Sequence, residues 1–99
     1  FDLSNKLIIV TGAARGNGKG IADGLYDFGA EIIAVDLNFD KNQKTNHINI
    51  SGDICDKTTI DKVIEICNNK EKDLVLINNA GISIPSEKYF FSSKIKSSS

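Results

Sequence analysis

A four-residue apolar run, Leu7–Val10, leads directly into a glycine-rich turn, and this junction constrains the fold more than any other feature. An unbroken run of branched apolar residues is typical of a strand that is buried on both faces, as in parallel sheets. After the turn, apolar residues recur at helical spacing and a glycine follows as a stop signal: Ile21, Ala22, Leu25, Phe28 and Gly29. The chain is therefore predicted to begin as strand, tight turn and helix.

The rest of the chain continues this alternation. Glu31–Asp36 and Asp73–Asn78 are predicted as buried strands, and His47–Ile50 as a short one. Between them, residues 37–46 are polar and too few for a full helix, so we expect a loop. A second helix is predicted to begin at Asp56 or Thr58, with an apolar face made of Ile60, Val63, Ile64 and Cys67. Strands that alternate with helices predict a parallel sheet with right-handed crossovers.

Composition excludes several classes of protein. The chain has 99 residues, enough for one small domain, and 40% of them are apolar. Its net charge of −1 and scattered basic residues argue against nucleic acid or an anionic membrane as a partner. No apolar run reaches the roughly 20 residues of a membrane span. The two cysteines have no metal-ligand spacing, so we expect no metal site and a cytoplasmic location.

The turn itself has the pattern G-x-x-x-G-x-G, formed by Gly12, Gly16 and Gly18. We expect Gly12 to let the chain leave the strand tightly and Gly16 to let the backbone approach a pyrophosphate. Gly18 would let the helix lie close to the strand, with phosphates meeting the positive helix end. A phosphate-binding P-loop is the nearest alternative, but Ala13 and Gly20 replace its first glycine and its Mg²⁺-binding Ser or Thr.

A carboxylate, Asp36, stands at the end of the second predicted strand. In this position it accepts hydrogen bonds from the adenosine ribose hydroxyls and repels a 2′-phosphate, so the sequence favours NAD over NADP. Arg15 argues the other way, because a guanidinium there would meet a 2′-phosphate. We expect NAD as the cofactor, with NADP the weaker alternative.

Two further motifs follow the third and fourth strands: Asp53-Ile54 and Asn78-Asn79-Ala80-Gly81. Together with the Thr11-Gly12-x-x-x-Gly16-x-Gly18 turn, in this order and at these distances, they resemble the short-chain dehydrogenase/reductase family. The opening Leu3-Ser4-Asn5-Lys6 resembles the usual start of that family. The resemblance covers about residues 3–84.

The resemblance implies a binding role for each matching position. The turn, which includes Ala14, Arg15, Gly16 and Asn17, holds the cofactor pyrophosphate, and Asp36 holds the adenosine ribose. Asp53 bonds the adenine amino group, with the Ile54 backbone beside it. The remaining cofactor-binding residues are Asn79, Ala80 and Gly81, which line the ribose side, while Asn78 helps to fix the central strand.

Three departures from the family pattern stand out. Asn17 replaces a usually apolar residue, and the loop after Asp36 is shorter than usual. The family's catalytic Ser and its Tyr-x-x-x-Lys pair are missing: Ala30 follows Tyr26 at the lysine spacing, Ser93 follows Tyr89, and Lys94 comes one position too late. We therefore assign no catalytic residue, and the absence of any methionine, even at position 1, leads us to expect a fragment.

These patterns predict an α/β fold, a Rossmann-type doubly wound parallel sheet that is incomplete, with about four strands in the order 3-2-1-4. We expect residues 1–86 to form a partial dinucleotide-binding domain and residues 87–99, with the serine-rich Ser92–Ser99, to be a disordered or non-native tail. An apolar strand left at the sheet edge would also invite aggregation.

For function, the resemblance implies an NAD(P)-dependent oxidoreductase that transfers hydride between a nicotinamide and a small-molecule alcohol or ketone. We expect the 99-residue chain to lack the catalytic segment and to be inactive. The full-length parent is expected to be a homo-oligomer, whereas the state of this chain stays open. Two alternatives remain: a non-catalytic dinucleotide-binding module, and a degenerate product that binds nothing.

Overall fold

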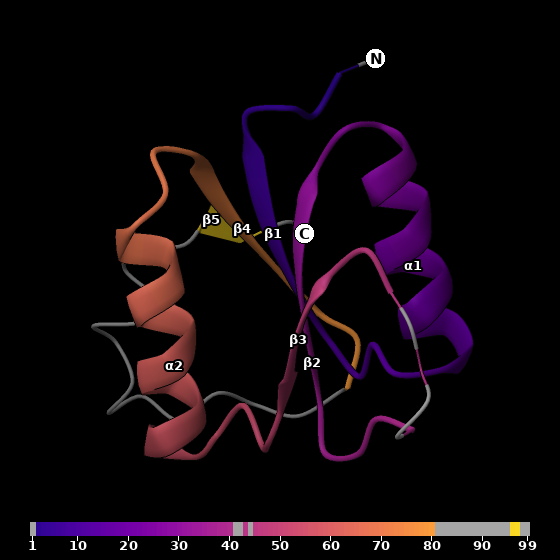
Figure 1. Ribbon diagram of the computed structural model, residues 1–99, viewed down its shortest axis with the longest axis vertical. Helices are drawn as coiled ribbons and strands as arrows, with labels where there is room; N and C mark the ends of the chain where they lie inside the picture. Colours follow the sequence, from indigo (N-terminus) through magenta and orange to yellow (C-terminus); the bar gives the residue numbers. More distant parts are fainter. Residues whose placement is uncertain (1, 41–42, 44, 81–95, 98–99) are drawn as a thin grey trace.

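A twisted parallel sheet with one helix on each side makes up the computed structural model (Figure 1), which describes residues 2–40, 43, 45–80 and 96–97. The elements in chain order are β1 (Lys6–Thr11), α1 (Gly16–Asp27), β2 (Glu31–Asp36), β3 (Ile48–Ser51), α2 (Lys57–Asn68), β4 (Asp73–Asn78) and β5 (Lys96–Ser97). The predicted bounds of β2 and β4 are confirmed to the residue, and those of β1 and β3 to within one residue at each end.

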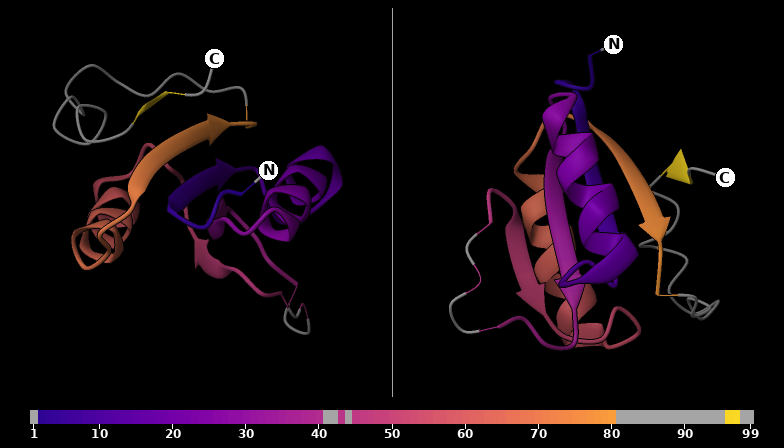
Figure 2. Two further views of the ribbon diagram at one scale, coloured as in Figure 1. Left: turned by 90° about the horizontal axis from the view of Figure 1, so that it is seen from above. Right: turned by 90° about the vertical axis from the view of Figure 1, so that its right-hand side faces the viewer.

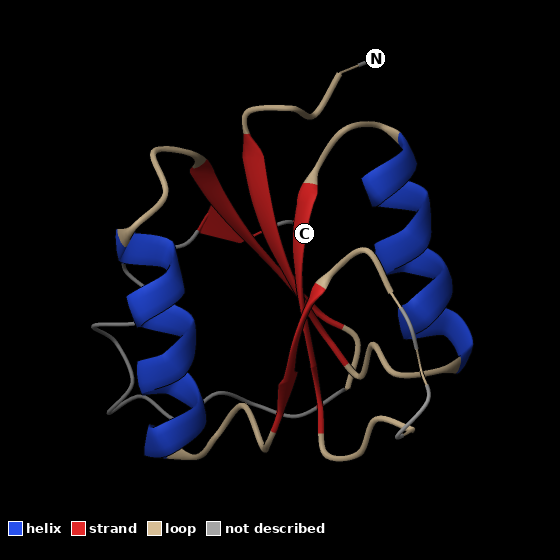
Figure 3. Ribbon diagram, in the orientation of Figure 1, coloured by secondary structure: helices blue, strands red, loops and turns tan. Residues whose placement is uncertain are grey.

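The strands lie in the order β3-β2-β1-β4-β5, and every neighbouring pair is parallel. The predicted α/β class and the order 3-2-1-4 are therefore confirmed. Because all strands run the same way, their carboxyl ends meet at one edge of the sheet, the lower edge in Figures 1 and 3. In parallel sheets of this kind ligands bind outside the carboxyl ends of the strands.

Two apolar clusters cover the two faces of the sheet. Alternate residues of β1 supply them: Leu7 and Ile9 belong to the cluster under α2, and Ile8 and Val10 to the cluster under α1. Figure 2 shows α1 and α2 on opposite sides of the strands. Since side chains along a strand point alternately to the two faces, a run that is apolar throughout is what a sheet covered on both sides requires.

The structure corrects the predicted apolar face of α1. Ala22 is fully buried, but Ile21 is 36% and Phe28 51% exposed. In the part of the chain that the structure describes, α1 is the one helix on this face of the sheet, and these two side chains lie outside its buried stripe. The apolar strand β4 is only half-buried over Asp73–Ile77.

A short pairing was not predicted in the tail. Lys96 and Ser97 pair with Val75 and Leu76 and form β5 at the edge of the sheet. The remaining residues of 87–99 lie outside the described residues, so the expectation of a disordered or non-native tail stays a prediction.

Candidate functional site

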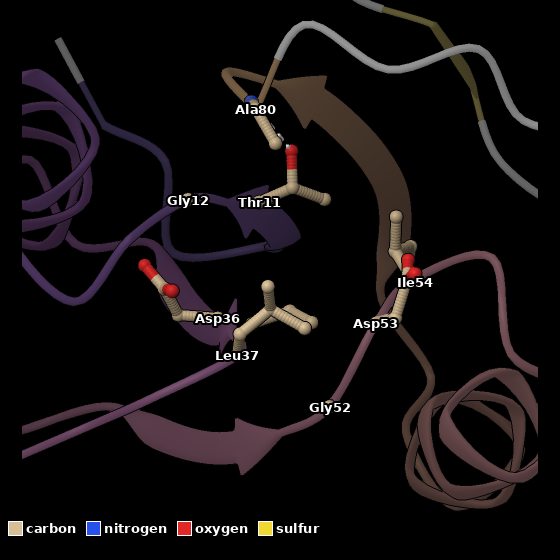
Figure 4. A pocket seen from close by; sticks show the side chains of 9 residues that line it. Thr11, Gly12, Asp36, Leu37, Gly52, Asp53, Ile54 and Ala80 are labelled. Carbon is tan, nitrogen blue, oxygen red and sulfur yellow. Dashed lines mark hydrogen bonds between the residues drawn. The ribbon is translucent and has the colours of Figure 1, made fainter.

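A cavity of about 230 Å³ opens at the carboxyl edge of the sheet. Its walls come from the ends of β1, β2, β3 and β4: Thr11, Gly12, Val35, Asp36, Leu37, Gly52, Asp53, Ile54 and Ala80. Figure 4 shows Asp36 and Leu37 on one side of it and Asp53 and Ile54 on the other. The predicted Asp36, Asp53, Ile54 and Ala80, which are distant in the sequence, are thus brought to one cavity.

Side-chain hydrogen bonds tie the ends of β1 and β4 together. The Thr11 hydroxyl donates to Oδ1 of Asn78 at 2.8 Å and accepts the Ala80 N–H at 3.2 Å. Nδ2 of Asn79 donates to the Gly12 carbonyl at 3.3 Å. The Asn-Asn-Ala segment is therefore attached to β1 and the glycine turn, and Asn78 is bonded to the central strand β1 as predicted.

Each of the three turn glycines has a separate structural reason. Gly12 and Gly16 have φ values of +65° and +61°, a region that side chains other than glycine rarely adopt. A Cβ added at Gly16 would have no atom within 4 Å, so the space beside it is open. A Cβ at Gly18 would overlap the Gly12 carbonyl oxygen and lie 2.7 Å from Nδ2 of Asn79, which confirms that this glycine lets α1 lie close to β1.

Asp36 faces the glycine turn rather than bulk solvent alone. Its Oδ2 accepts the Ala14 N–H at 3.0 Å, and its carbonyl accepts the Gly52 N–H at 2.8 Å. Arg15 is held differently: its guanidinium donates to the Asn38 carbonyl at 3.2 Å and lies 3.9 Å from the Asp40 carboxylate, with 67% of its side chain exposed. A fixed carboxylate and a partly neutralised cation therefore flank the turn.

The opposite wall combines a carboxylate with apolar surface. Oδ1 of Asp53 accepts the Cys55 N–H at 2.9 Å, which fixes the turn after β3, and Ile54 is buried. Across the cavity stands Leu37, which is 64% exposed although it is a large apolar residue. Leu37 and Ile54 thus give the cavity an apolar residue on each side, each next to an aspartate (Figure 4).

The other predicted site residues lie on the glycine turn, except for one that is outside the described residues. Ala14 is buried, while Arg15, Gly16 and Asn17 are exposed around the start of α1, and Gly81 lies outside the described residues. The sequence did not identify Leu37 or Gln43 as part of the site. Leu37 could have been noticed in the sequence, since it is an apolar residue that directly follows Asp36 at the start of a polar loop. Gln43 could not, because its contact with the turn depends on how the loop folds.

A second, smaller cavity of about 210 Å³ lies between α1 and the segment before β3. There His47, whose side chain is only 3% exposed, pairs through Nε2 with Oδ1 of Asp23 at 2.8 Å and meets Tyr26 edge-on at 5.4 Å. Hydrogen bonds from Lys19 and then His47 hold the pKa of Asp23 below its usual value of 3.8. The His47 ring is thus held between the Asp23 carboxylate and the Tyr26 ring.

Within the described part of the chain, no group of three or more His, Cys, Asp or Glu side chains is arranged to hold a metal ion. None of the helices described there is long and apolar enough to cross a bilayer. Tyr26 has Ala30 four residues later, and Tyr89, Ser93 and Lys94 lie outside the described residues. The arrangement at the large cavity suits binding: it offers amides at a helix start, two carboxylates and an apolar slot.

Comparison with known proteins agrees with this geometry. The family model for short chain dehydrogenases matches residues 6–97. The 2-dehydro-3-deoxy-D-gluconate 5-dehydrogenase of Pseudoalteromonas atlantica is 36% identical over 92 residues, and the NAD-dependent glycerol dehydrogenase of Listeria innocua 34% over 91. These matches take in 82% and 85% of the chain but only 36% of each relative.

A solved structure shares the fold. The ligand-free aldohexose dehydrogenase of Thermoplasma acidophilum superposes with a TM-score of 0.69 at 26% identity, over 93% of this chain and 43% of that protein. The chain therefore spans well under half the length of the proteins that it matches.

Proposed function

Because the chain belongs to the short-chain dehydrogenase family, we propose that its large cavity and glycine turn bind NAD, in preference to NADP. The observation that carries the proposal is the convergence of Gly12, Asp36 and Asp53 at one cavity, with open space beside Gly16 in the same turn. A dinucleotide needs all three features that meet there: a phosphate approach, a ribose acceptor and an adenine slot.

The residues fit the parts of the cofactor in turn. Gly16 offers backbone amides without a Cβ beside the start of α1, where the positive helix end favours a pyrophosphate. Asp36 has a second carboxylate oxygen, Oδ1, for the adenosine ribose while Oδ2 stays on Ala14. Leu37 and Ile54 give apolar surface for the two faces of adenine, and Asp53 an acceptor for its amino group.

The cofactor would supply the redox chemistry, since its nicotinamide ring accepts or donates a hydride. The chain's own residues hold the adenosine and pyrophosphate half. We propose that in a complete protein this serves oxidation of a small-molecule alcohol or reduction of a ketone. The relatives named for glycerol and 2-dehydro-3-deoxy-D-gluconate fit that class. Homo-oligomerisation of the complete protein and a cytoplasmic location belong to the same proposal.

Calorimetric titration with NAD and NADP tests the binding proposal. We expect NAD to bind more tightly to the chain. Asp36→Asn keeps an acceptor oxygen for the Ala14 N–H but removes the charge that repels a 2′-phosphate. The ratio of NAD affinity to NADP affinity should therefore fall. Asp61→Asn, on α2 and paired with Lys57, removes an equal charge away from the cavity and should leave the preference unchanged. No binding, or equal affinity for both cofactors, would contradict the proposal.

A non-catalytic binding module is the second candidate. It is favoured by the lack of a Tyr-x-x-x-Lys pair anywhere in the sequence of 99 residues. The chain should therefore bind NAD without reducing it when alcohols are added, as followed by NADH absorbance. Turnover by the purified chain would show that it contains a proton donor that the sequence does not reveal.

A further inference from the structure

Two of the described residues between β2 and β3, Asn38 and Gln43, are hydrogen-bonded to the glycine turn. Nε2 of Gln43 donates to the Ala14 carbonyl at 2.8 Å, in a half-buried contact between residues far apart in the sequence. Its Oε1 accepts the Asp40 N–H at 3.2 Å, and its own N–H donates to the Asp40 carbonyl at 2.9 Å. Gln43 thus bonds both Asp40 and the Ala14 carbonyl of the glycine turn.

The contact orients a peptide of the proposed pyrophosphate site. In a planar trans peptide the carbonyl and the following N–H point in opposite directions. By holding the Ala14 carbonyl, Gln43 fixes the direction of the Arg15 N–H, which directly precedes Gly16. The adjacent Ala14 N–H is fixed at the same time by Asp36, so both peptides of this corner have a set orientation.

Asp40, which Gln43 bonds, lies beside the Arg15 side chain. The Gln43–Asp40 bonds place the Asp40 carboxylate 3.9 Å from the Arg15 guanidinium, which also donates to the Asn38 carbonyl at 3.2 Å. Arg15 directly follows Ala14, whose N–H bonds the Asp36 carboxylate, so its guanidinium is a cation that would attract a 2′-phosphate. In this fold it is already engaged with the segment that Gln43 anchors.

We propose that Gln43 is a positioning residue that sets cofactor discrimination: it anchors the segment after β2 on the glycine turn, so that Arg15 is held by Asn38 and Asp40. The inference rests on the proposed NAD function and deepens it. It adds a second source of NAD preference to the charge of Asp36, and one that acts without touching the cofactor.

The test combines a ligand-free measurement with cofactor titrations. Gln43→Ala removes the anchor, and Gln43→Met removes it while keeping the length of the side chain. The matched control is Asn69→Ala, which removes an equivalent amide-to-carbonyl bond, from Asn69 to Glu65 at 3.1 Å, on α2 away from the cavity. In ligand-free NMR spectra both Gln43 variants should shift the Arg15 and Gly16 amides, and the control should not.

In titrations we expect both Gln43 variants to lower NAD affinity by about fivefold, the usual effect of one hydrogen bond, and to lose less or gain for NADP. In an Arg15→Ala background the change in the NAD-to-NADP ratio should disappear, because Gln43 acts on discrimination through Arg15. A purely structural role would lower both affinities equally and leave that ratio unchanged.

The outcomes separate the two proposals. If the unaltered chain binds NAD but the Gln43 variants keep its affinity and its ratio, this inference is wrong and the proposed function stands. If the unaltered chain binds neither cofactor, both are wrong. Unchanged Arg15 and Gly16 amides in the ligand-free variants would by themselves show that Gln43 does not orient the turn.

Discussion

Replacing Gly18 by alanine tests how closely α1 is seated on β1. The added Cβ would overlap the Gly12 carbonyl oxygen, a backbone atom that cannot swing aside as the end of a side chain can. Overpacking of this kind costs about 1–3 kcal/mol, and we expect the upper half of that range. Alanine also gains about 1 kcal/mol over glycine in a helix, so the net loss should be about 1–2 kcal/mol.

Gly20 provides a matched control in the same helix. A Cβ there meets no atom within 4 Å, so Gly20→Ala should stabilise the chain by about 1 kcal/mol through helix propensity alone. The two variants should then differ by about 2–3 kcal/mol, or roughly 10–20 °C in melting midpoint for a domain of this size. Urea and thermal unfolding followed by circular dichroism measure the difference. Equal stability would refute the close approach of the two elements.

Two further predictions concern the cavity wall and the ion pairs. Leu37→Ala should weaken NAD binding by about fivefold, because about 1 kcal/mol of apolar contact with adenine is lost. Ile21→Ala, on the outer side of α1, should leave NAD affinity unchanged. Calorimetry compares the two variants, and equal NAD affinities would place adenine elsewhere. Lys70 and then Lys72 hold the pKa of Glu31 below 4.5, so this carboxylate stabilises the fold above that pH and the contribution is lost as pH falls through the depressed value. Glu31→Gln should therefore cost about 0.5 kcal/mol at pH 7 and nothing in strong acid, as read from urea unfolding at several pH values; a cost that persists in acid would assign it to packing.

The strands were predictable because their signals are local. Glu31–Asp36 is bounded by Gly29 and by a polar loop, and Asp73–Asn78 runs from a charged segment into the Asn-Ala-Gly turn, so the bounds of both follow from neighbouring residues. The glycine turn was predictable for a different reason. Backbone positions with positive φ, such as Gly12 and Gly16, restrict the residue type whatever surrounds them.

Features that depend on what covers an element were not predictable. Phe28 has helical spacing with the buried residues of α1, yet it is exposed because no second helix lies beside α1 in the described part of the chain. Gln43 stands among polar loop residues that look alike in sequence, and only the folded loop brings its amide to Ala14. Leu37 is an intermediate case. Its position directly after Asp36 can be read from the sequence, but its place in the same cavity wall as Ile54 depends on the fold.

We propose above that the carboxyl edge of this sheet holds the adenosine and pyrophosphate parts of NAD. It is tested most directly by titrating the isotope-labelled chain with NAD and following its backbone amides by NMR. Shifts should concentrate at Ala14 and Gly16 in the glycine turn and at Leu37 and Asp53 in the wall of the large cavity. Shifts centred on the smaller cavity at His47, or no shifts at millimolar NAD, would contradict it.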